Sequence, residues 1–79
     1  MLESLPDLQS FPLELGEYVH YRGNHYRVHA VGSHSESLEP YVIYQALYGD
    51  HRYFVRPYAM FIEMVEVDGQ MIPRFKKLG

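Results

Sequence analysis

The chain has 79 residues, no cysteine and a formal charge of −3, and 47% of its residues are hydrophobic. This length predicts one domain with a marginal core, which must hold unaided or through a homodimer, and the hydrophobic fraction excludes intrinsic disorder. The absence of cysteine excludes disulfides and thiolate metal sites, and the acidic balance argues against a general nucleic-acid binder. No apolar run approaches about 18 residues, so we expect no membrane span or signal peptide and place the protein in the cytoplasm.

Residues 1–15 are expected to form an N-terminal arm ahead of a small β-barrel domain at residues 16–79. Leucines recur along the arm, but Pro6 and Pro12 exclude a continuous helix. The spacing allows one helical turn or an extended strand. Such an arm covers an edge or end of the domain, or binds a partner.

A hairpin signal follows at Gly23 and Asn24, between β-rich runs at residues 18–21 and 25–31. A two-residue tip at these positions segregates apolar from polar side chains on the two faces, which a one-residue slip would undo. The predicted core pairs are Val19 with Val28 and Tyr21 with Tyr26. The predicted polar face holds His20, Arg22, His25, Arg27 and His29.

A central hairpin is predicted from residues 41–48 and 53–55, with a turn at residues 49–52 and an end at Pro57. The predicted pairs are Tyr48 with Tyr53, Leu47 with Phe54, and Ala46 with Val55. Both faces of this hairpin are then apolar. A sheet that curls on itself accounts for this pattern better than a flat one.

The remaining segments complete the expected topology. Residues 32–40 are a polar loop, residues 57–60 predict a short 3₁₀ turn, and residues 61–67 alternate like a strand. Asp68 and Gly69 predict a tight turn.

That turn places Val65 opposite Ile72, and Pro73 confines the return strand to an edge, ahead of a basic tail at residues 74–79. The sequence therefore predicts an all-β fold. Its expected form is a small SH3-like barrel of about five antiparallel strands, with the 3₁₀ turn before the last strand.

Several blocks between residues 16 and 75 resemble the small bacterial family known as domain of unknown function sixteen fifty-three. The first block is Tyr18, His20, Tyr21, Arg22, Gly23, Tyr26 and Val28, and the second is His34, Ser35, Glu36, Ser37 and Glu39. The others are Val42, Tyr44, Leu47, Tyr48, Gly49, then Phe54, Val55, Arg56, Pro57, Met60, Phe61, Glu63, and last Pro73, Arg74, Phe75. Ser37 stands where the family usually has Thr, and Phe54 where Trp is common. The family implies no established activity.

Three histidines, His20, His25 and His29, lie on the predicted polar face. A zinc site needs three or four converging ligands, and the interleaved arginines would repel a cation, so we expect neither a metal nor a cofactor. A solvated face is the leading interpretation. RNA or anion binding stays open, and would gain if four arginines shared one surface. These are Arg22, Arg27, Arg52 and Arg74.

The loop residues His34, Ser35, Glu36 and Glu39 superficially offer a base, a nucleophile and two acids. Neighbouring residues rarely aim at one atom, so a catalytic triad is not expected. Hydrogen bonds that fix the loop and contacts to a ligand are the two remaining interpretations.

Arg56 and Glu63 are charges in an otherwise apolar context. They are expected to pair with each other or with the loop acids, or else Arg56 binds a carboxylate or phosphate of a ligand. We expect a non-catalytic binding module that recognises a peptide or small anionic ligand where the 32–40 loop meets Arg56. A small enzyme using His34, Glu36 and Arg56 is the alternative. The expected ligand-binding residues are His34, Ser35, Glu36, Glu39, Tyr44, Tyr48, Arg56 and Glu63.

Overall fold

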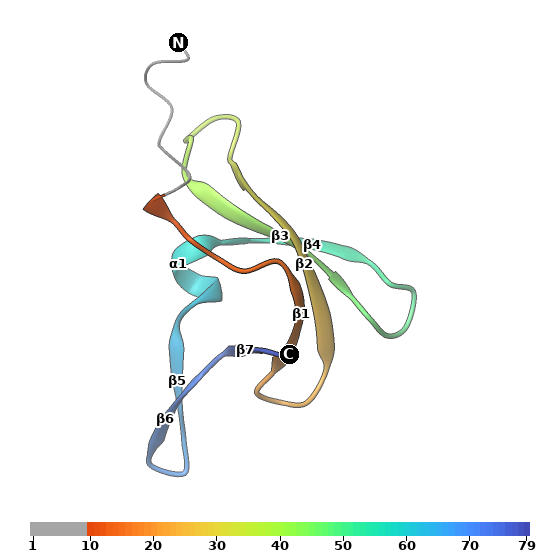
Figure 1. The fold of residues 1–79 in the computed structure, drawn as a ribbon. Helices are drawn as coiled ribbons and strands as arrows, with labels where there is room; N and C mark the ends of the chain where they lie inside the picture. The colour runs from red at the N-terminus through yellow and green to blue at the C-terminus, as the bar shows by residue number, and fades with distance from the viewer. Residues whose placement is uncertain (1–9) are drawn as a thin grey trace.

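The computed structural model describes residues 10–79, which form seven β-strands and one short helix (Figure 1). The elements are β1 (Gly16–His20), β2 (His25–Ser33), β3 (Pro40–Ala46), β4 (Tyr53–Pro57), α1 (Tyr58–Phe61), β5 (Met64–Val67), β6 (Gln70–Pro73) and β7 (Phe75–Lys77). The fold is therefore all-β, as the sequence predicts. Most of the expected arm lies outside the described residues.

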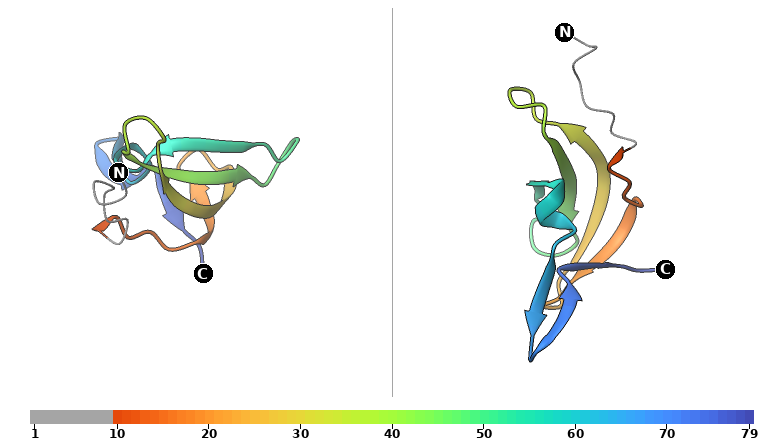
Figure 2. Two further views of the ribbon diagram at one scale, coloured as in Figure 1. Left: turned by 90° about the horizontal axis from the view of Figure 1, so that it is seen from above. Right: turned by 90° about the vertical axis from the view of Figure 1, so that its left-hand side faces the viewer.

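Five strands form one antiparallel sheet in the order β4-β3-β2-β1-β7, and β5 and β6 form a separate two-stranded ribbon. Figure 2 shows that the large sheet is strongly curved. Its two edge strands are β4 and β7, and no strand pairing within residues 10–79 joins them. The pairings thus produce a curved open sheet rather than a closed barrel.

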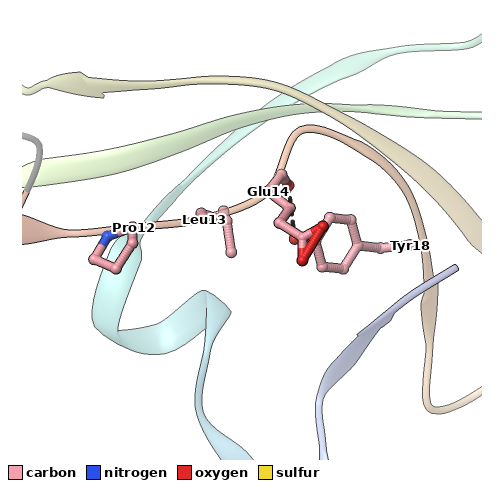
Figure 3. Close-up of a pocket in the computed structure, with 4 residues that line it drawn as sticks. All are labelled: Pro12, Leu13, Glu14 and Tyr18. Atoms are coloured by element: carbon pink, nitrogen blue, oxygen red, sulfur yellow. Dashed lines mark hydrogen bonds between the residues drawn. The ribbon is translucent and has the colours of Figure 1, made fainter. Parts of the chain in front are cut away.

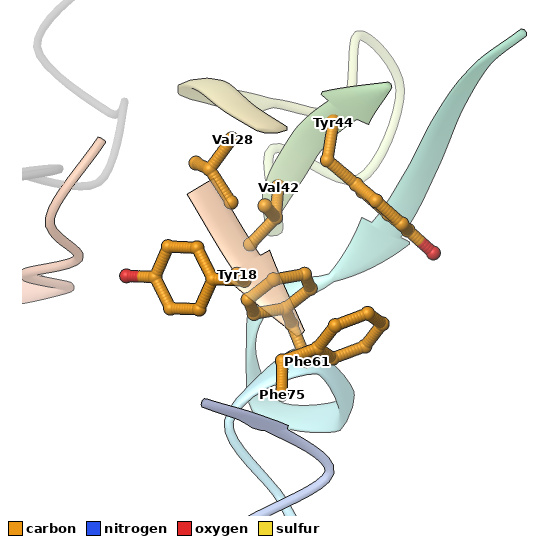
Figure 4. Packing of buried hydrophobic residues seen from close by; sticks show 6 residues of the cluster. All are labelled: Tyr18, Val28, Val42, Tyr44, Phe61 and Phe75. Atoms are coloured by element: carbon orange, nitrogen blue, oxygen red, sulfur yellow. The ribbon is translucent and has the colours of Figure 1, made fainter. Parts of the chain in front are cut away.

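The hydrophobic core lies on one face of this sheet, which we call the inner face. Its buried members are Tyr18, Val28, Val42, Tyr44, Phe61 and Phe75 (Figure 4). The rings of Phe61 and Phe75 stack with centroids 4.1 Å apart and planes 4° from parallel. In a domain of this size each large apolar group contributes a substantial part of the core. This explains why α1 and β7 both carry a phenylalanine to the inner face.

Two segments differ from the prediction here. Phe61 was expected to begin a strand but closes α1, and only Met64–Val67 of the expected 61–67 strand is extended. Residues 74–79 were expected to be a basic tail, yet β7 pairs with β1, placing Phe75 opposite His20. The Phe75 ring is buried, and this burial stabilises β7 although the residues on either side of Phe75 are charged.

The first hairpin has a longer turn than predicted. Val19 lies opposite His25 instead of Val28, a register shift of three residues, and the His20 N–H donates to the Asn24 carbonyl at 2.8 Å. Gly23 adopts φ +108° in this turn. Because the shift is odd, β1 is turned over and Tyr18, not Val19, enters the core.

The central hairpin differs in the same way. Tyr53 lies opposite Gln45 rather than Tyr48, again three residues away, and the longer turn contains Gly49 and His51, both with positive φ. Phe54 and Arg56 therefore share the inner face.

The Asp68 and Gly69 turn is confirmed. Val65 lies opposite Ile72, and both turn residues have positive φ, as a two-residue hairpin turn requires. The short turn expected after Pro57 is present as the single helical turn α1. None of the helices within residues 10–79 has the length and apolar character to cross a membrane.

Candidate binding site

Aromatic and cationic side chains meet on the inner face, around the end of β7. We call this cluster the inner-face site. It comprises His20, Arg22, Tyr26, Tyr44, Tyr48, Phe54, Arg56, Arg74 and Phe75, drawn from β1, β2, β3, β4, β7 and the adjoining turns. The sheet order places these elements together, although they are spread from residue 20 to residue 75.

Tyr26 is the centre of the aromatic part. Its ring centroid lies 5.5 Å from those of Tyr44 and Tyr48, 5.6 Å from that of Phe75 and 6.4 Å from that of Phe54, all in edge-on contacts. Tyr44 and Phe75 are buried, whereas Tyr48 is 42% and Phe54 37% exposed. A buried aromatic floor therefore carries an exposed aromatic rim.

Arg56 lies beside this floor and has no acidic partner within residues 10–79. Its Nε donates to the Tyr44 hydroxyl at 3.1 Å, and its Cζ is 5.8 Å from the centroid of the Phe75 ring. The ion pairs of the described residues do not include it. A guanidinium has five N–H donors, so the half-buried Arg56 retains donors for a further group.

Glu63 pairs with Arg74 and not with Arg56. The Arg74 Nη2 donates to Glu63 Oε1 at 2.9 Å, and the Arg74 backbone N–H donates to the Glu63 carbonyl at 3.0 Å. The expected pairing of Arg56 with Glu63, or with the loop acids Glu36 and Glu39, is therefore wrong. The Nε of Arg74 is buried and has no hydrogen-bond partner among the described residues.

His20 is the common neighbour of the cations. Its ring lies 4.9 Å from that of Phe75, and its Nδ1 accepts the backbone N–H of Arg22 at 3.1 Å. Burial lowers the pKa of His20 from 6.5, and the positive charges of Arg56, Arg74 and Arg22 lower that pKa further. His20 is thus a neutral imidazole at pH 7, subject to the positive charges of three guanidinium groups.

The 34–39 loop is fixed by its own hydrogen bonds. The His34 Nδ1 accepts the backbone N–H groups of Glu36 and Ser37 at 3.1 and 3.2 Å. Ser35 Oγ donates to Glu36 Oε2 at 2.6 Å, and the Glu39 N–H donates to Ser37 Oγ at 3.2 Å. This arrangement matches the interpretation in which the loop's polar residues fix its conformation.

The loop faces away from Arg56. His34 packs near Tyr41, with ring centroids 5.4 Å apart, and both line a shallow pocket with Ile43 and Val55. Val55 and Arg56 are consecutive in β4, so their side chains point to opposite faces of the sheet. The structure therefore does not bring His34 and Glu36 to Arg56. It keeps Tyr44, Tyr48 and Arg56 of the predicted set together.

The four arginines whose presence on one surface would favour RNA binding are divided. Arg22 and Arg74 belong to the inner-face site, whereas Arg27 lies opposite Glu17 on the outer face and Arg52 pairs with Asp50 at 3.1 Å.

The other two histidines lie away from this site. His25 Nδ1 is 2.7 Å from Glu17 Oε2, and His29 Nε2 is 2.8 Å from Gln45 Oε1. Within residues 10–79, no three His, Cys, Asp or Glu side chains are grouped to hold a metal ion.

The last residues of the expected arm lie against the domain (Figure 3). Pro12, Leu13, Glu14 and Tyr18 line an open pocket, in which the Tyr18 hydroxyl donates to the Glu14 carbonyl at 2.7 Å. The Tyr58 hydroxyl donates to the Pro12 carbonyl at 2.9 Å. These contacts satisfy both hydroxyls, and the charged side chain of the lining, that of Glu14, is acidic, so this pocket is a weaker candidate for an anion.

Six of the nine members of the inner-face site were not among the expected ligand-binding residues. His20 and Arg22 were assigned to a polar face, Tyr26 and Phe54 to apolar faces of the two hairpins, and Arg74 and Phe75 to a tail. The Pro73-Arg74-Phe75 block of the family resemblance was the one signal that marked the last two.

Comparisons with known proteins agree with the motif resemblance. A family model described as protein of unknown function (DUF1653) matches residues 16–77. The crystal structure of a DUF1653 protein from Bordetella bronchiseptica is similar, with a TM-score of 0.80 and 28% sequence identity. The alignment covers 92% of this chain and 94% of that chain. No curated protein matches the sequence.

Proposed function

This chain belongs to the DUF1653 family of proteins of unknown function, and we propose that it is a non-catalytic, SH3-like binding module for an anionic ligand at the inner-face site. The observation that carries this proposal is Arg56. Its guanidinium is half-buried, donates to a tyrosine hydroxyl and pairs with no carboxylate of residues 10–79. A partly desolvated charge without a counter-ion favours binding of an anion.

The exposed aromatic rim supports a ligand that also has a flat or apolar part. Tyr48 and Phe54 are both more than one third exposed beside the buried floor. Aromatic rings bind flat groups by stacking or edge contacts, while the planar guanidinium fixes the anion. The cytoplasmic location and the homodimer expected from the sequence remain part of this proposal.

Hydrogen bonding favours binding over catalysis. The His34 Nδ1 and the His20 Nδ1 each accept a backbone N–H, and no carboxylate of the described residues bonds to either ring. A general base needs a free nitrogen within reach of the substrate and a group that orients its ring. The proposal therefore leaves the 34–39 loop in a structural role.

Titration with benzoate and phenyl phosphate, followed by ¹H–¹⁵N NMR, tests the site. We expect shifts at the amides of His20, Tyr44 and Phe75, and roughly tenfold weaker binding by Arg56→Lys, because lysine lacks the planar fork. Arg52→Lys is the matched control, since Arg52 is exposed and pairs with Asp50.

A structural role for Arg56 gives a different result. In that case Arg56→Lys lowers the melting temperature clearly, and neither probe shifts the inner-face amides of the parent protein. That outcome would reject the proposed function.

A further inference from the structure

The charges of the inner-face site define a class of anion. Three guanidinium groups, on Arg22, Arg56 and Arg74, act electrostatically on His20, and one of them, that of Arg74, pairs with the carboxylate of Glu63. With His20 neutral, two positive charges are left. A carboxylate ligand neutralises one of them, whereas a phosphate monoester carries a charge of about −1.5 to −2 at pH 7.

The unused donors come from three separate segments. Arg56 has donors beyond its bond to Tyr44, and the Nε of Arg74 is buried without a partner. The Nδ1 of His20 is an acceptor, so a neutral His20 carries its proton on Nε2 and is a donor there. A phosphate has several acceptor oxygens for such a set, and a carboxylate has two.

The aromatic rim adds the second part of the ligand. The Tyr26 and Tyr48 hydroxyls are 2.7 Å apart, which holds the exposed Tyr48 ring against the buried floor. The partly exposed Phe54 ring lies 5.7 Å from that of Tyr44, whose hydroxyl accepts from Arg56. A flat ring bound at this rim therefore lies near the guanidinium that binds the anion.

Building on the proposed function, we infer that the inner-face site binds a phosphate monoester dianion attached to a flat ring. The phosphate lies beside the Phe75 ring, which His20 and Arg56 contact and Arg74 directly precedes, and the ring of the ligand packs on Tyr48 and Phe54. A free nucleoside monophosphate and a phosphotyrosine side chain both have this chemistry.

Three probes separate this inference from the broader proposal. Phenyl phosphate has the ring and the dianion, benzoate has the ring and one charge, and inorganic phosphate has the dianion alone. We expect phenyl phosphate to bind at least about tenfold more tightly than either of the others, because charge-assisted hydrogen bonds and ring contacts both contribute.

Each contrary result has a distinct meaning. Benzoate binding as tightly as phenyl phosphate overturns the inference but leaves an anion-binding module. If inorganic phosphate binds as tightly as phenyl phosphate, the aromatic rim does not contribute to binding and its proposed role is overturned. If none of the three shifts the inner-face amides, the inference and the proposed function both fail.

Variants locate the phosphate. Arg74→Lys should reduce the preference for phenyl phosphate over benzoate severalfold, while Lys76→Gln, at an exposed position of β7, should not. Unchanged preference in a folded Arg74→Lys protein contradicts the placement.

If Arg74→Lys does not fold, the Glu63→Gln variant tests the placement of the phosphate instead. It removes the competing carboxylate, so phenyl phosphate should bind about threefold more tightly, with a smaller gain for benzoate. Equal affinity of this variant and the parent protein contradicts the inference.

Adenosine monophosphate and a short phosphotyrosine peptide then identify the source. At least one should bind more tightly than phenyl phosphate, and the tighter of the two names the source. If both bind more weakly than phenyl phosphate, the site does not fit the natural carriers of this chemistry and the inference is wrong.

Discussion

The inner-face site and the 34–39 loop each contain a histidine and several charged or polar side chains, but their polar atoms are used differently. In the loop, His34 accepts hydrogen bonds from residues two and three positions ahead, and Ser35 bonds to Glu36. In the inner-face site, Arg56 and Arg74 come from distant segments and keep donors without partners. Locally satisfied polar groups indicate a structural role, whereas unsatisfied ones assembled from distant segments indicate a binding site.

The largest expected effect is on stability, from removing the Phe61 ring that supports the aromatic floor of the site. Phe61 is 1% exposed and stacks on Phe75, so Phe61→Ala should lower the free energy of unfolding by about 3–5 kcal/mol. Urea denaturation measures this. A loss below about 1 kcal/mol would show that the aromatic floor does not depend on α1.

A change in the loop should affect stability but not binding. His34→Ala removes the acceptor of two backbone N–H groups, which should cost about 1 kcal/mol, comparable to the loss of a helix cap. Its affinity for phenyl phosphate should equal that of the parent protein. Weaker binding would place the loop in the site and end the contrast between the two regions.

The pH dependence of stability should depend on His20. Its pKa is lowered in the folded protein, so the unfolded chain binds the proton more readily and stability falls as pH drops below about 6.5. His20→Gln should lose less stability than the parent protein between about pH 7.5 and about pH 5.5, as measured by urea denaturation at each pH. Other titrating groups are common to both proteins. Equal losses would show that burial and the three arginines do not lower the pKa of His20.

The smallest effect concerns the rim. Burial, followed by the hydrogen bond to Tyr48, raises the pKa of Tyr26 to about 12. Tyr48→Phe removes the bond and should lower this pKa, with a stability loss under about 1 kcal/mol because the contact is exposed. Ultraviolet absorbance during an alkaline titration follows the ionisation. An unchanged titration curve would mean that the two hydroxyls do not interact.

The strand content was predictable, but the register was predictable only where the turn was short. Asp68 and Gly69 form the two-residue turn that their types favour, and the pairing of Val65 with Ile72 followed. Gly23 and Gly49 also mark turns, but those turns are longer. Nothing in the local pattern gives their length, and each shift of three residues turned one strand over.

The site was predictable in part for a related reason. Tyr44, Tyr48 and Arg56 lie within one hairpin, so the local pattern placed them together. His20 and Phe75 meet only because β7 pairs with β1, a contact between distant segments that no local periodicity indicates. The partner of Glu63 was missed for the same reason, since Arg74 reaches it at the entry to β7.

The pairing of β1 with β7 also determines when the site can form during folding. It joins Tyr18 to Lys77, so a long chain segment must be closed before this contact is gained, whereas the β2–β3 and β3–β4 pairs are local. We expect the three local strands to organise first and β7 to dock last, bringing Phe75 and Arg74 to the site. A ligand of the inner-face site would then slow the unfolding rate while leaving the folding rate nearly unchanged.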